Sequence, residues 1–293
     1  MNQRFQGVIP ALITPFTSNN QIDVEGLRRN IEFVIKGGVS AIVPCGTTGE
    51  SATMTAEEHM KVVDIAIESS KVPVIAGTGS NSTEEAIIFT KHAQDAGAAA
   101  ALIITPYYNK PTQNGLKAHF EKIANSVDIP IILYNVPSRT GVDMAVFTIA
   151  DLAKHENIIG IKEATGDMGK ATEILHKTKD DDFILLSGDD VATLPLMSIG
   201  ATGVISVIAN ILPQKMSQMV AAYQKGNLSE AVKIHYELAP LMKSLFIETN
   251  PVPIKTAARL SGHAAGPLRL PLVDMMPANL EILKNELKKA GVI

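Results

Sequence analysis

The sequence has no tryptophan, only one cysteine and few aromatic residues of any kind. Because Cys45 has no second cysteine to pair with, no disulfide can form within the chain, which favours a reducing compartment. No apolar stretch reaches the roughly 18 residues that a membrane-spanning helix needs. Pro10 and Pro15 interrupt the segment where an export signal needs an unbroken apolar run. We therefore expect a cytoplasmic protein with no membrane partner.

Dense positive charge is also missing. No run of Lys or Arg exceeds two residues, and the formal net charge is −4 at pH 7. A nucleic-acid surface or a polybasic membrane patch needs more than this. The seven histidines show no spacing typical of a zinc site. The remaining expectation is small-molecule chemistry without nucleic acid, metal or organic cofactor.

Apolar residues are plentiful, because 46 % of the 293 residues are hydrophobic, enough for a large core. Many of them fall in short, nearly continuous runs that suit parallel strands covered on both faces. These runs are Gly7–Phe16, Ala41–Gly46, Pro73–Gly79, Ala100–Pro106, Ile129–Asn135, Ile158–Ala164, Phe183–Asp189 and Thr202–Asn210.

Amphipathic segments between the runs look helical. Thr55 and Ser82 each stand three residues before a Glu, which is the spacing of a capping box at a helix start. Gly37-Gly38 and Gly97 stand where helices should end. Eight strand–helix units predict an α/β protein with a (β/α)8 barrel. A doubly wound sheet is disfavoured, because no Gly-x-Gly-x-x-Gly turn follows the first strand.

Beyond Asn227 the pattern changes to helices without strands. The predicted helices are Leu228–Ile247, Pro251–Leu260 and Pro277–Ala290. They are too few to need a core of their own. We therefore divide the chain into a catalytic barrel, 1–227, and a C-terminal helical region, 228–293.

Active-site groups of such a barrel come from the carboxyl ends of its strands. Those ends hold Thr47-Thr48, Tyr107-Tyr108, Tyr134, Arg139, Lys162-Glu163, Ser187-Gly188-Asp189 and Ile205. Lys162 is the sharpest candidate, because burial in an apolar strand favours its neutral amine. A neutral amine attacks a ketone, and the protonated imine withdraws electrons from the adjacent carbon. A structural ion pair with Glu163 is the alternative.

Other strand ends supply groups that complement such an amine. The phenol of Tyr134 is able to pass protons near an imine, and the planar guanidinium of Arg139 suits a substrate carboxylate. Thr47 and Thr48 offer hydroxyl and backbone N–H groups for a second carboxylate. Each also has an ordinary alternative: an aromatic at the barrel mouth, a surface-loop arginine and a plain polar turn.

Taken in order, these segments resemble the dihydrodipicolinate synthase / N-acetylneuraminate lyase family over nearly the whole chain. The resemblance is carried by Gly46-Thr47-Thr48-Gly49-Glu50, Thr105-Pro106-Tyr107-Tyr108-Asn109-Lys110-Pro111, Leu133-Tyr134-Asn135-Val136-Pro137-Ser138-Arg139-Thr140, Gly160-Ile161-Lys162-Glu163-Ala164, Gly203-Val204-Ile205-Ser206-Val207, Asn250-Pro251-Val252-Pro253-Ile254-Lys255 and Leu268-Arg269-Leu270-Pro271-Leu272.

The resemblance implies roles for individual residues. Lys162 is expected to form the imine with pyruvate, while Tyr134, Thr47 and Tyr108 relay protons. Tyr108 is expected to reach across a subunit interface, in a homotetramer built as a dimer of dimers. The residues expected to bind substrate are Thr48, which holds the pyruvate carboxylate, Gly188, Ile205 through its main-chain carbonyl, and Arg139, which holds the carboxylate of L-aspartate-4-semialdehyde.

Arg139 separates the branches of this family. Members that cleave sialic acid or 2-keto-3-deoxy sugar acids share the lysine and tyrosine but generally lack the Tyr-Asn-x-Pro-Ser-Arg-Thr-Gly stretch. The implied reaction is therefore condensation of pyruvate with the semialdehyde to 4-hydroxy-tetrahydrodipicolinate, towards diaminopimelate and lysine. The alternatives are an aldolase acting on those sugar acids and a barrel that binds a keto acid without turnover. The last would have lost its lysine or tyrosine, and neither is missing.

Feedback inhibition by L-lysine is a further hypothesis. In inhibited relatives, a site at the dimer interface uses positions that match Ser51, Ala52, Ala56, His59, Gly79, Asn81, Glu85 and Tyr107. Ala56 departs from the pattern, because inhibited enzymes often have a polar or ionisable side chain there.

Overall fold

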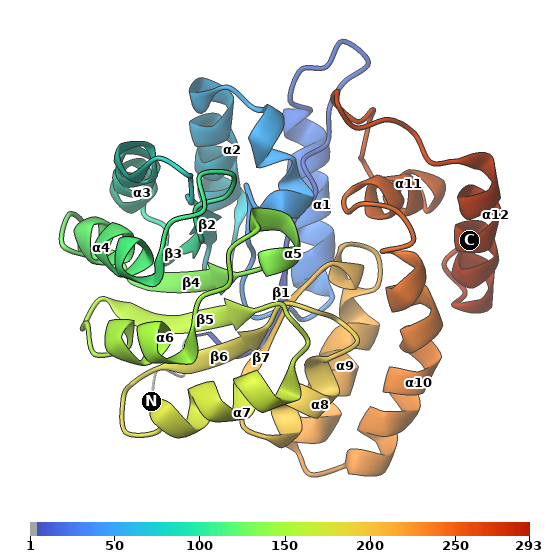
Figure 1. The fold of residues 1–293 in the computed structure, drawn as a ribbon. Helices are drawn as coiled ribbons and strands as arrows, with labels where there is room; N and C mark the ends of the chain where they lie inside the picture. Colours follow the sequence, from blue (N-terminus) through green and yellow to red (C-terminus); the bar gives the residue numbers. More distant parts are fainter. Residues whose placement is uncertain (1–4) are drawn as a thin grey trace. The chain divides into compact units, whose positions relative to one another are not determined.

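The computed structural model describes residues 5–293, which divide into two compact units. The first, here called the sheet unit, consists mainly of Val74–Ile205, and the second, the terminal unit, consists of Gly7–Pro73 and Ser206–Ile293. Figure 1 shows the elements of both units coloured along the sequence. The predicted domain boundary after residue 227 lies within the terminal unit and stays a prediction.

Parallel strands form the centre of the sheet unit. They are β2 (Ile75–Gly77), β3 (Ala100–Ile104), β4 (Ile131–Asn135), β5 (Ile158–Glu163), β6 (Ile184–Ser187) and β7 (Gly203–Ser206). Each strand pairs in parallel with the next one along the chain. Chain order is therefore sheet order, as crossover connections through helices produce.

Helices cover one side of these strands (Figure 1). They are α3 (Thr83–Ala96), α4 (Gln113–Ala124), α6 (Val146–Leu152) and α7 (Met168–Lys177), with the shorter α5 (Pro137–Thr140) and α8 (Thr193–Ser198) between strands. Ile131 and Leu133 of β4 and Ile161 of β5 pack with Phe120 of α4 in one buried cluster. Since side chains alternate along a strand, Tyr134 and Lys162 project from the opposite face.

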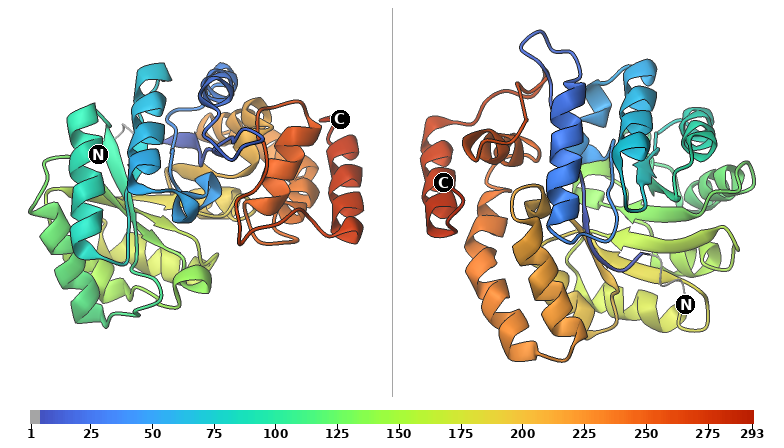
Figure 2. Two further views of the ribbon diagram at one scale, coloured as in Figure 1. Left: turned by 90° about the horizontal axis from the view of Figure 1, so that it is seen from above. Right: turned by 180° about the vertical axis from the view of Figure 1, so that it is seen from behind.

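The terminal unit is mostly helical. It contains β1 (Gly7–Pro10), α1 (Val24–Lys36), the 3₁₀ turns η1 (Thr47–Gly49), η2 (Ser51–Thr53) and η3 (Ile208–Asn210), α2 (Ala56–Ser69), α9 (Pro213–Gln224), α10 (Leu228–Ser244), α11 (Val252–Leu260) and α12 (Pro277–Lys289). Helices α9 and α10 run side by side, and α12 packs against α10 (Figure 2). The predicted C-terminal helices are therefore present, with slightly different ends.

The run predicted as a second strand is less regular than expected. Ser40 and Val43 donate their N–H groups to the carbonyls of Val8 and Pro10, at 2.9 Å each. This is the start of a parallel ladder beside β1, but only a bridge between Ala11 and Val43 is formed. The ladder stops because Cys45 turns the backbone to a φ of +56°.

Local signals at helix ends are largely confirmed. Thr55 and Glu58 form the reciprocal capping box that begins α2, and Gly97 ends α3 with a φ of +95°. Ser82 accepts a hydrogen bond from the Glu85 N–H, which is half of the predicted box. The carboxylate of Glu85 instead accepts a hydrogen bond from Ser80 Oγ at 2.5 Å.

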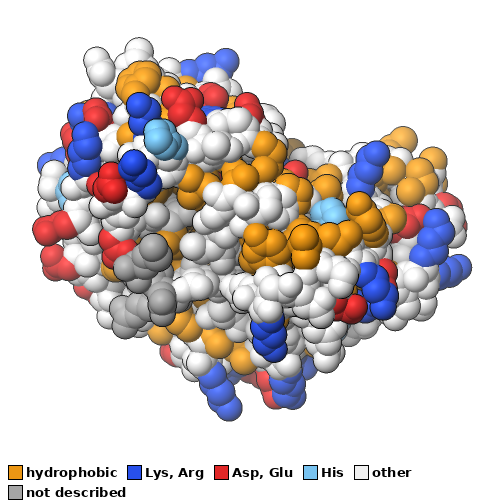
Figure 3. Space-filling model, turned by 90° about the horizontal axis from the view of Figure 1, so that it is seen from below, with side chains coloured by type: hydrophobic (Ala, Val, Ile, Leu, Met, Phe, Trp, Pro, Cys, Tyr) orange, Lys and Arg blue, Asp and Glu red, His pale blue; other side chains and the backbone are white. Residues whose placement is uncertain are grey.

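Charges of both signs are mixed on one face of the molecule. On the face drawn in Figure 3, Lys and Arg side chains lie among Asp and Glu side chains. Within residues 5–293, no helix is long and apolar enough to cross a membrane. The same residues contain no group of three or more His, Cys, Asp or Glu side chains arranged to hold a metal ion.

Candidate active site

Two of the predicted residues meet on the face of the sheet turned away from the helices. Tyr134 of β4 and Lys162 of β5 are paired in the strand register, and both are buried. Lys162 Nζ lies 4.0 Å from the centroid of the Tyr134 ring. The contact is with the face of the ring, which attracts a cation and holds the end of a flexible lysine in place. A buried amine with a phenol beside it is therefore present.

The alternative interpretation, in which Lys162 forms a structural ion pair with Glu163, is wrong. Glu163 follows Lys162 along β5, so the two side chains project from opposite faces of the sheet. The Glu163 carboxylate accepts hydrogen bonds from Asn135 Nδ2 at 3.0 Å and from the Thr165 N–H at 2.8 Å. Within the described part of the chain, Lys162 makes no ion pair at all. No carboxylate in residues 5–293 therefore holds Nζ in a structural ion pair.

Arg139 lies on the short helix α5, immediately after β4, and its side chain is exposed. Thr140 fixes this turn, because its hydroxyl donates to the carbonyls of Val136 and Val142 at 3.3 and 2.9 Å. Gly141 ends the turn in the left-handed region, with a φ of +72°. The guanidinium is thus carried by a rigid turn that follows the strand of Tyr134.

Gly188 and Ile205 lie at the ends of the next strands. The Gly188 N–H donates to the Glu163 carbonyl at 2.7 Å, and a Cβ atom there would lie 2.5 Å from that of Ala164. Only glycine fits so close to β5. Ile205 is buried in β7.

Tyr107 and Tyr108 lie in the loop between β3 and α4. The side chain of Tyr108 is 90 % exposed, and its backbone has a φ of +72°. A large aromatic residue at positive φ is uncommon and strained. Asn109 Nδ2 donates to the carbonyl of Asn81 at 2.9 Å, which ties this loop to the segment before α3. The loop is therefore held in a shape that presents Tyr108 to the outside.

Thr47 and Thr48 form the turn η1 in the terminal unit. Thr48 is buried, and its Oγ1 accepts a hydrogen bond from Asn250 Nδ2 at 2.9 Å. Gly49 allows the close approach of this turn, because a Cβ atom there would lie 3.1 Å from the Leu12 carbonyl oxygen. The two threonines are thus held in a compact, hydrogen-bonded turn, as carboxylate binding by hydroxyl and N–H groups needs.

A buried ion pair lies directly behind this turn. Glu50 Oε1 lies 2.5 Å from Lys255 Nζ, and Glu50 Oε2 accepts the Arg269 N–H at 3.0 Å. Burial lowers the pKa of Lys255, while the neighbouring Glu50 carboxylate acts in the opposite direction. Lys255 also donates to the Pro267 carbonyl at 2.8 Å. The pair fastens the Thr47–Thr48 turn to α11 and the segment after it.

The remaining residues of the predicted lysine site lie in both units. In the terminal unit, Ser51 and Ala52 belong to η2, and His59 is buried on α2. In the sheet unit, Asn81 precedes α3 and Glu85 lies in its first turn. That these residues together bind lysine stays a prediction. Cys45 is buried, and burial raises the pKa of its thiol, which fits the predicted role of a small filler.

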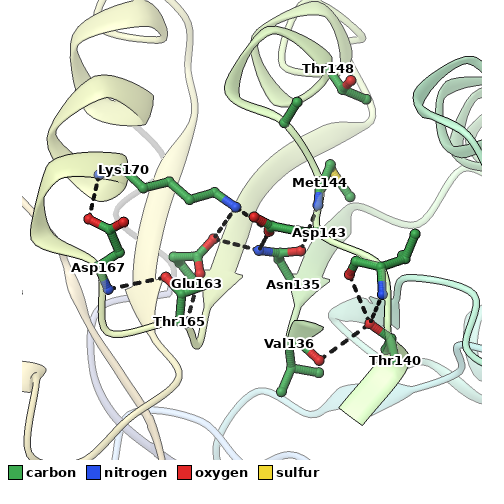
Figure 4. A network of polar contacts seen from close by, with 12 residues as sticks. Asn135, Val136, Thr140, Asp143, Met144, Thr148, Glu163, Thr165, Asp167 and Lys170 are labelled. Carbon is green, nitrogen blue, oxygen red and sulfur yellow. Dashed lines mark hydrogen bonds and ion pairs between the residues drawn. The ribbon is translucent and has the colours of Figure 1, made fainter. Parts of the chain in front are cut away.

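Several polar residues at the strand ends were missed from the sequence. Asn135, Asp143 and Lys170 gather around Glu163 (Figure 4). Asn250 and Lys255 support the threonine turn. A signal was present for Asn135 and Glu163, because each follows a reactive residue by one position and therefore belongs to the helix-facing side.

Comparisons with known proteins agree on one family. The model of the Dihydrodipicolinate synthetase family matches residues 4–290. The 4-hydroxy-tetrahydrodipicolinate synthase of Methanosarcina acetivorans is 64 % identical over 289 residues, which cover 99 % of each chain.

Solved structures agree as well. A crystal structure of a dihydrodipicolinate synthase, 50 % identical, matches with a TM-score of 0.96 over 99 % of this chain and 100 % of that chain. The chloride-inhibited dihydrodipicolinate synthase of Acinetobacter baumannii, solved with pyruvate, is 44 % identical, with a TM-score of 0.95 over 98 % and 99 % of the two chains. With the parallel strands and C-terminal helices described above, these likenesses confirm the predicted (β/α)8 fold class.

Proposed function

Because the chain belongs to the dihydrodipicolinate synthetase family, we propose that it condenses pyruvate with L-aspartate-4-semialdehyde to give 4-hydroxy-tetrahydrodipicolinate. This is a lyase-class reaction on the route to diaminopimelate and lysine. The names of the relatives support this branch over the sugar-acid aldolases. The turn that carries Arg139 supports it too, since the second substrate brings its own carboxylate.

One observation carries the proposal: a buried lysine amine without an ionic partner in residues 5–293 lies beside a tyrosine ring at the strand ends. Lys162 Nζ attacks the ketone carbon of pyruvate, and loss of water leaves a protonated imine. A proton then leaves the methyl carbon, and the resulting enamine attacks the aldehyde carbon. The amino group of the semialdehyde finally attacks the imine carbon, which closes the ring and frees Lys162.

Tyr134 is assigned to proton transfer in these steps. Its ring face contacts the amine, and its hydroxyl is proposed to exchange protons with the oxygen of the bound substrate. General acid–base catalysis of this kind contributes about 10²- to 10⁴-fold to a rate. Thr47 and Tyr108 complete the proposed relay, and Thr48 binds the pyruvate carboxylate.

The remaining substrate contacts follow from the strand ends. Gly188 and the Ile205 carbonyl border the imine, where a side chain at position 188 has no room. Arg139 binds the carboxylate of the semialdehyde through a bidentate contact. We also propose a homotetramer built as a dimer of dimers, in which Tyr108 enters the site of a neighbouring subunit.

The cellular setting and the regulation belong to the same proposal. The single, buried thiol of Cys45 suits a cytoplasmic enzyme. L-lysine is proposed to inhibit through Ser51, Ala52, His59, Asn81, Glu85 and Tyr107, and a lysine titration of initial rates tests this. A rate that stays flat into the millimolar range would remove the lysine site.

Borohydride trapping tests the central claim. We expect incubation with pyruvate and borohydride to leave a reduced pyruvyl adduct on Lys162, located by peptide mass spectrometry. The variant Lys162→Ala should form none and lose activity. Trapping without turnover of the semialdehyde, but with pyruvate release from a 2-keto-3-deoxy sugar acid, would move the function to the aldolase branch. A folded protein with no adduct would refute imine chemistry.

A further inference from the structure

Four polar side chains form a cluster on the helix-facing side of the strand ends, and we call it the Asn135 cluster: Asn135, Asp143, Glu163 and Lys170 (Figure 4). Asn135 and Glu163 are the last residues of β4 and β5, and they face each other in the strand register. Both are fully buried. The Tyr134–Lys162 pair precedes them by one residue, so the cluster lies directly behind that pair.

The amide of Asn135 is fully used by this arrangement. Its Nδ2 donates to Glu163 Oε2 at 3.0 Å and to Asp143 Oδ1 at 2.8 Å, while its Oδ1 accepts the Met144 N–H at 3.0 Å. The first bond joins two strands. The other two join β4 to the far end of the loop that carries Arg139, which runs from residue 136 to residue 144.

Two carboxylates thus converge on one amide group, and their charges repel each other. Lys170, from the first turn of α7, offsets this repulsion. Its Nζ contacts Asp143 Oδ1 and lies 3.9 Å from Glu163 Oε2. The side chain of Lys170 is only 11 % exposed, whereas that of Asp143 is 54 % exposed. Without Lys170, Asp143 is therefore the carboxylate that is free to swing away into water.

From this geometry we propose that the Asn135 cluster positions the Arg139 loop, and that Lys170 thereby sets the affinity for the second substrate. Lys170 is a positioning residue, since it acts through Asp143 and the loop backbone. The first substrate is largely independent of it, because Lys162 and Tyr134 are fixed by the strands. The inference rests on the proposed function for its kinetic readout.

The variant Lys170→Met removes the cation and keeps the length of the side chain. We expect KM for L-aspartate-4-semialdehyde to rise about tenfold, because a misplaced guanidinium loses part of its charge-assisted bonds. KM for pyruvate and borohydride trapping at Lys162 should stay unchanged. A change of both KM values by the same factor, or of neither, would overturn the proposal.

The double variant Lys170→Met/Asp143→Asn provides a rescue. Asparagine at position 143 still accepts from Asn135 Nδ2 but carries no charge, so the repulsion disappears. We expect its KM for the semialdehyde to return most of the way to the wild-type value. A double variant no better than Lys170→Met would contradict the charge argument.

Two further variants separate a specific effect from a general one. Lys170→Arg keeps the cation and should retain the wild-type KM. Lys117→Met breaks an exposed pair with Asp151 between α4 and α6 of the same unit, at 3.0 Å, and should change neither constant. If Lys170→Met failed to fold, Asp143→Ala would carry the test, because it removes the loop's acceptor for Asn135 Nδ2. A rise in KM for the semialdehyde alone would support the proposal, and an unchanged KM would overturn it.

Hydrogen exchange of the free protein gives a readout without substrate. The amide N–H groups of residues 136–144 should exchange faster in Lys170→Met than in the wild type, while those of β4 and β5 stay protected. If this loop exchanges faster in Lys170→Met but the wild type does not turn over the semialdehyde, the proposed function is refuted, while the positioning of the loop by the Asn135 cluster still holds. Unchanged exchange in Lys170→Met would refute that positioning role itself.

Discussion

In the proposed function, the choice of the second substrate depends on the side chain of Arg139. We expect Arg139→Ala to raise KM for L-aspartate-4-semialdehyde by about 10- to 100-fold, because a charge-assisted pair with the carboxylate is lost. Pyruvate trapping at Lys162 should persist. Steady-state kinetics with each substrate varied in turn measures both effects.

A matched variant sharpens this test. Arg139→Lys keeps the charge but loses the planar fork, so it should recover only part of the affinity. Equal weakening of pyruvate and semialdehyde in both variants would show that Arg139 serves the fold of the turn rather than a substrate.

The position of Lys162 and Tyr134 at neighbouring strand ends was predictable from the sequence, whereas the residues that support them were not. Lys162 and Tyr134 each end an apolar run, and barrel strands present their ends to the site. Lys170 stands seven residues beyond β5 on a helix, and nothing in its local pattern indicates contact with Asp143. That contact depends on how the loop after α5 closes, which spacing does not encode.

A buried histidine at the contact between α3 and α4 is expected to make the free energy of unfolding depend on pH. His119 of α4 is buried, and burial lowers its pKa from 6.5 to about 4. Its Nδ1 lies 2.9 Å from Thr83 Oγ1 of α3. Because the unfolded chain binds this proton more readily, the neutral histidine contributes stability that is fully present above pH 6.5. That contribution is lost as the pH falls towards 4, up to roughly 3 kcal/mol.

Denaturant unfolding of the wild type and of His119→Gln should reveal the contribution of neutral His119 to the free energy of unfolding. Between pH 7 and pH 5, the free energy of unfolding of the wild type should fall by more than that of the variant. His176→Gln, which changes an exposed histidine on α7, should follow the wild type. Parallel pH curves for the wild type and His119→Gln would contradict the assignment.

The order of helices and strands was also predictable, and its limits have physical causes. Seven of the eight apolar runs contain a strand, but Ala41–Gly46 forms only isolated bridges, at Ile42 and Val43. Its apolar composition could not reveal that Cys45 adopts a positive φ. The half-formed box at Ser82 has a similar cause, since a second hydroxyl, that of Ser80, binds the Glu85 carboxylate.

At the scale of the whole molecule, the exposed side chain and strained backbone of Tyr108 support the proposed oligomer. If Tyr108 serves the site of another subunit, inactive Lys162→Ala and weakened Tyr108→Phe chains should complement each other. Each mixed pair then holds one site with both groups intact. We expect co-expressed chains, purified as mixed oligomers, to recover a large fraction of the activity of one normal site. Activity no higher than the average of the separate variants would show that Tyr108 acts within its own chain.

The division into the sheet unit and the terminal unit could not be predicted from the sequence. Composition changes at Asn227, where strands give way to helices, yet the terminal unit draws its residues from both ends of the chain. Which distant segments pack together depends on contacts such as that of Asn250 with Thr48, not on local pattern.

The ion pair of Glu50 and Lys255 forms late during translation, because its two residues lie far apart in the sequence. The two residues are 205 positions apart, so at 5–20 residues per second roughly 10 to 40 s separate their synthesis. Throughout that interval the nascent chain has no counter-ion for Glu50, and the threonine turn beside it has no anchor. Val74–Ile205, by contrast, is contiguous and leaves the ribosome before Lys255 is made. All residues of Val74–Ile205, which include Lys162, are therefore made before the turn proposed to receive pyruvate gains its anchor.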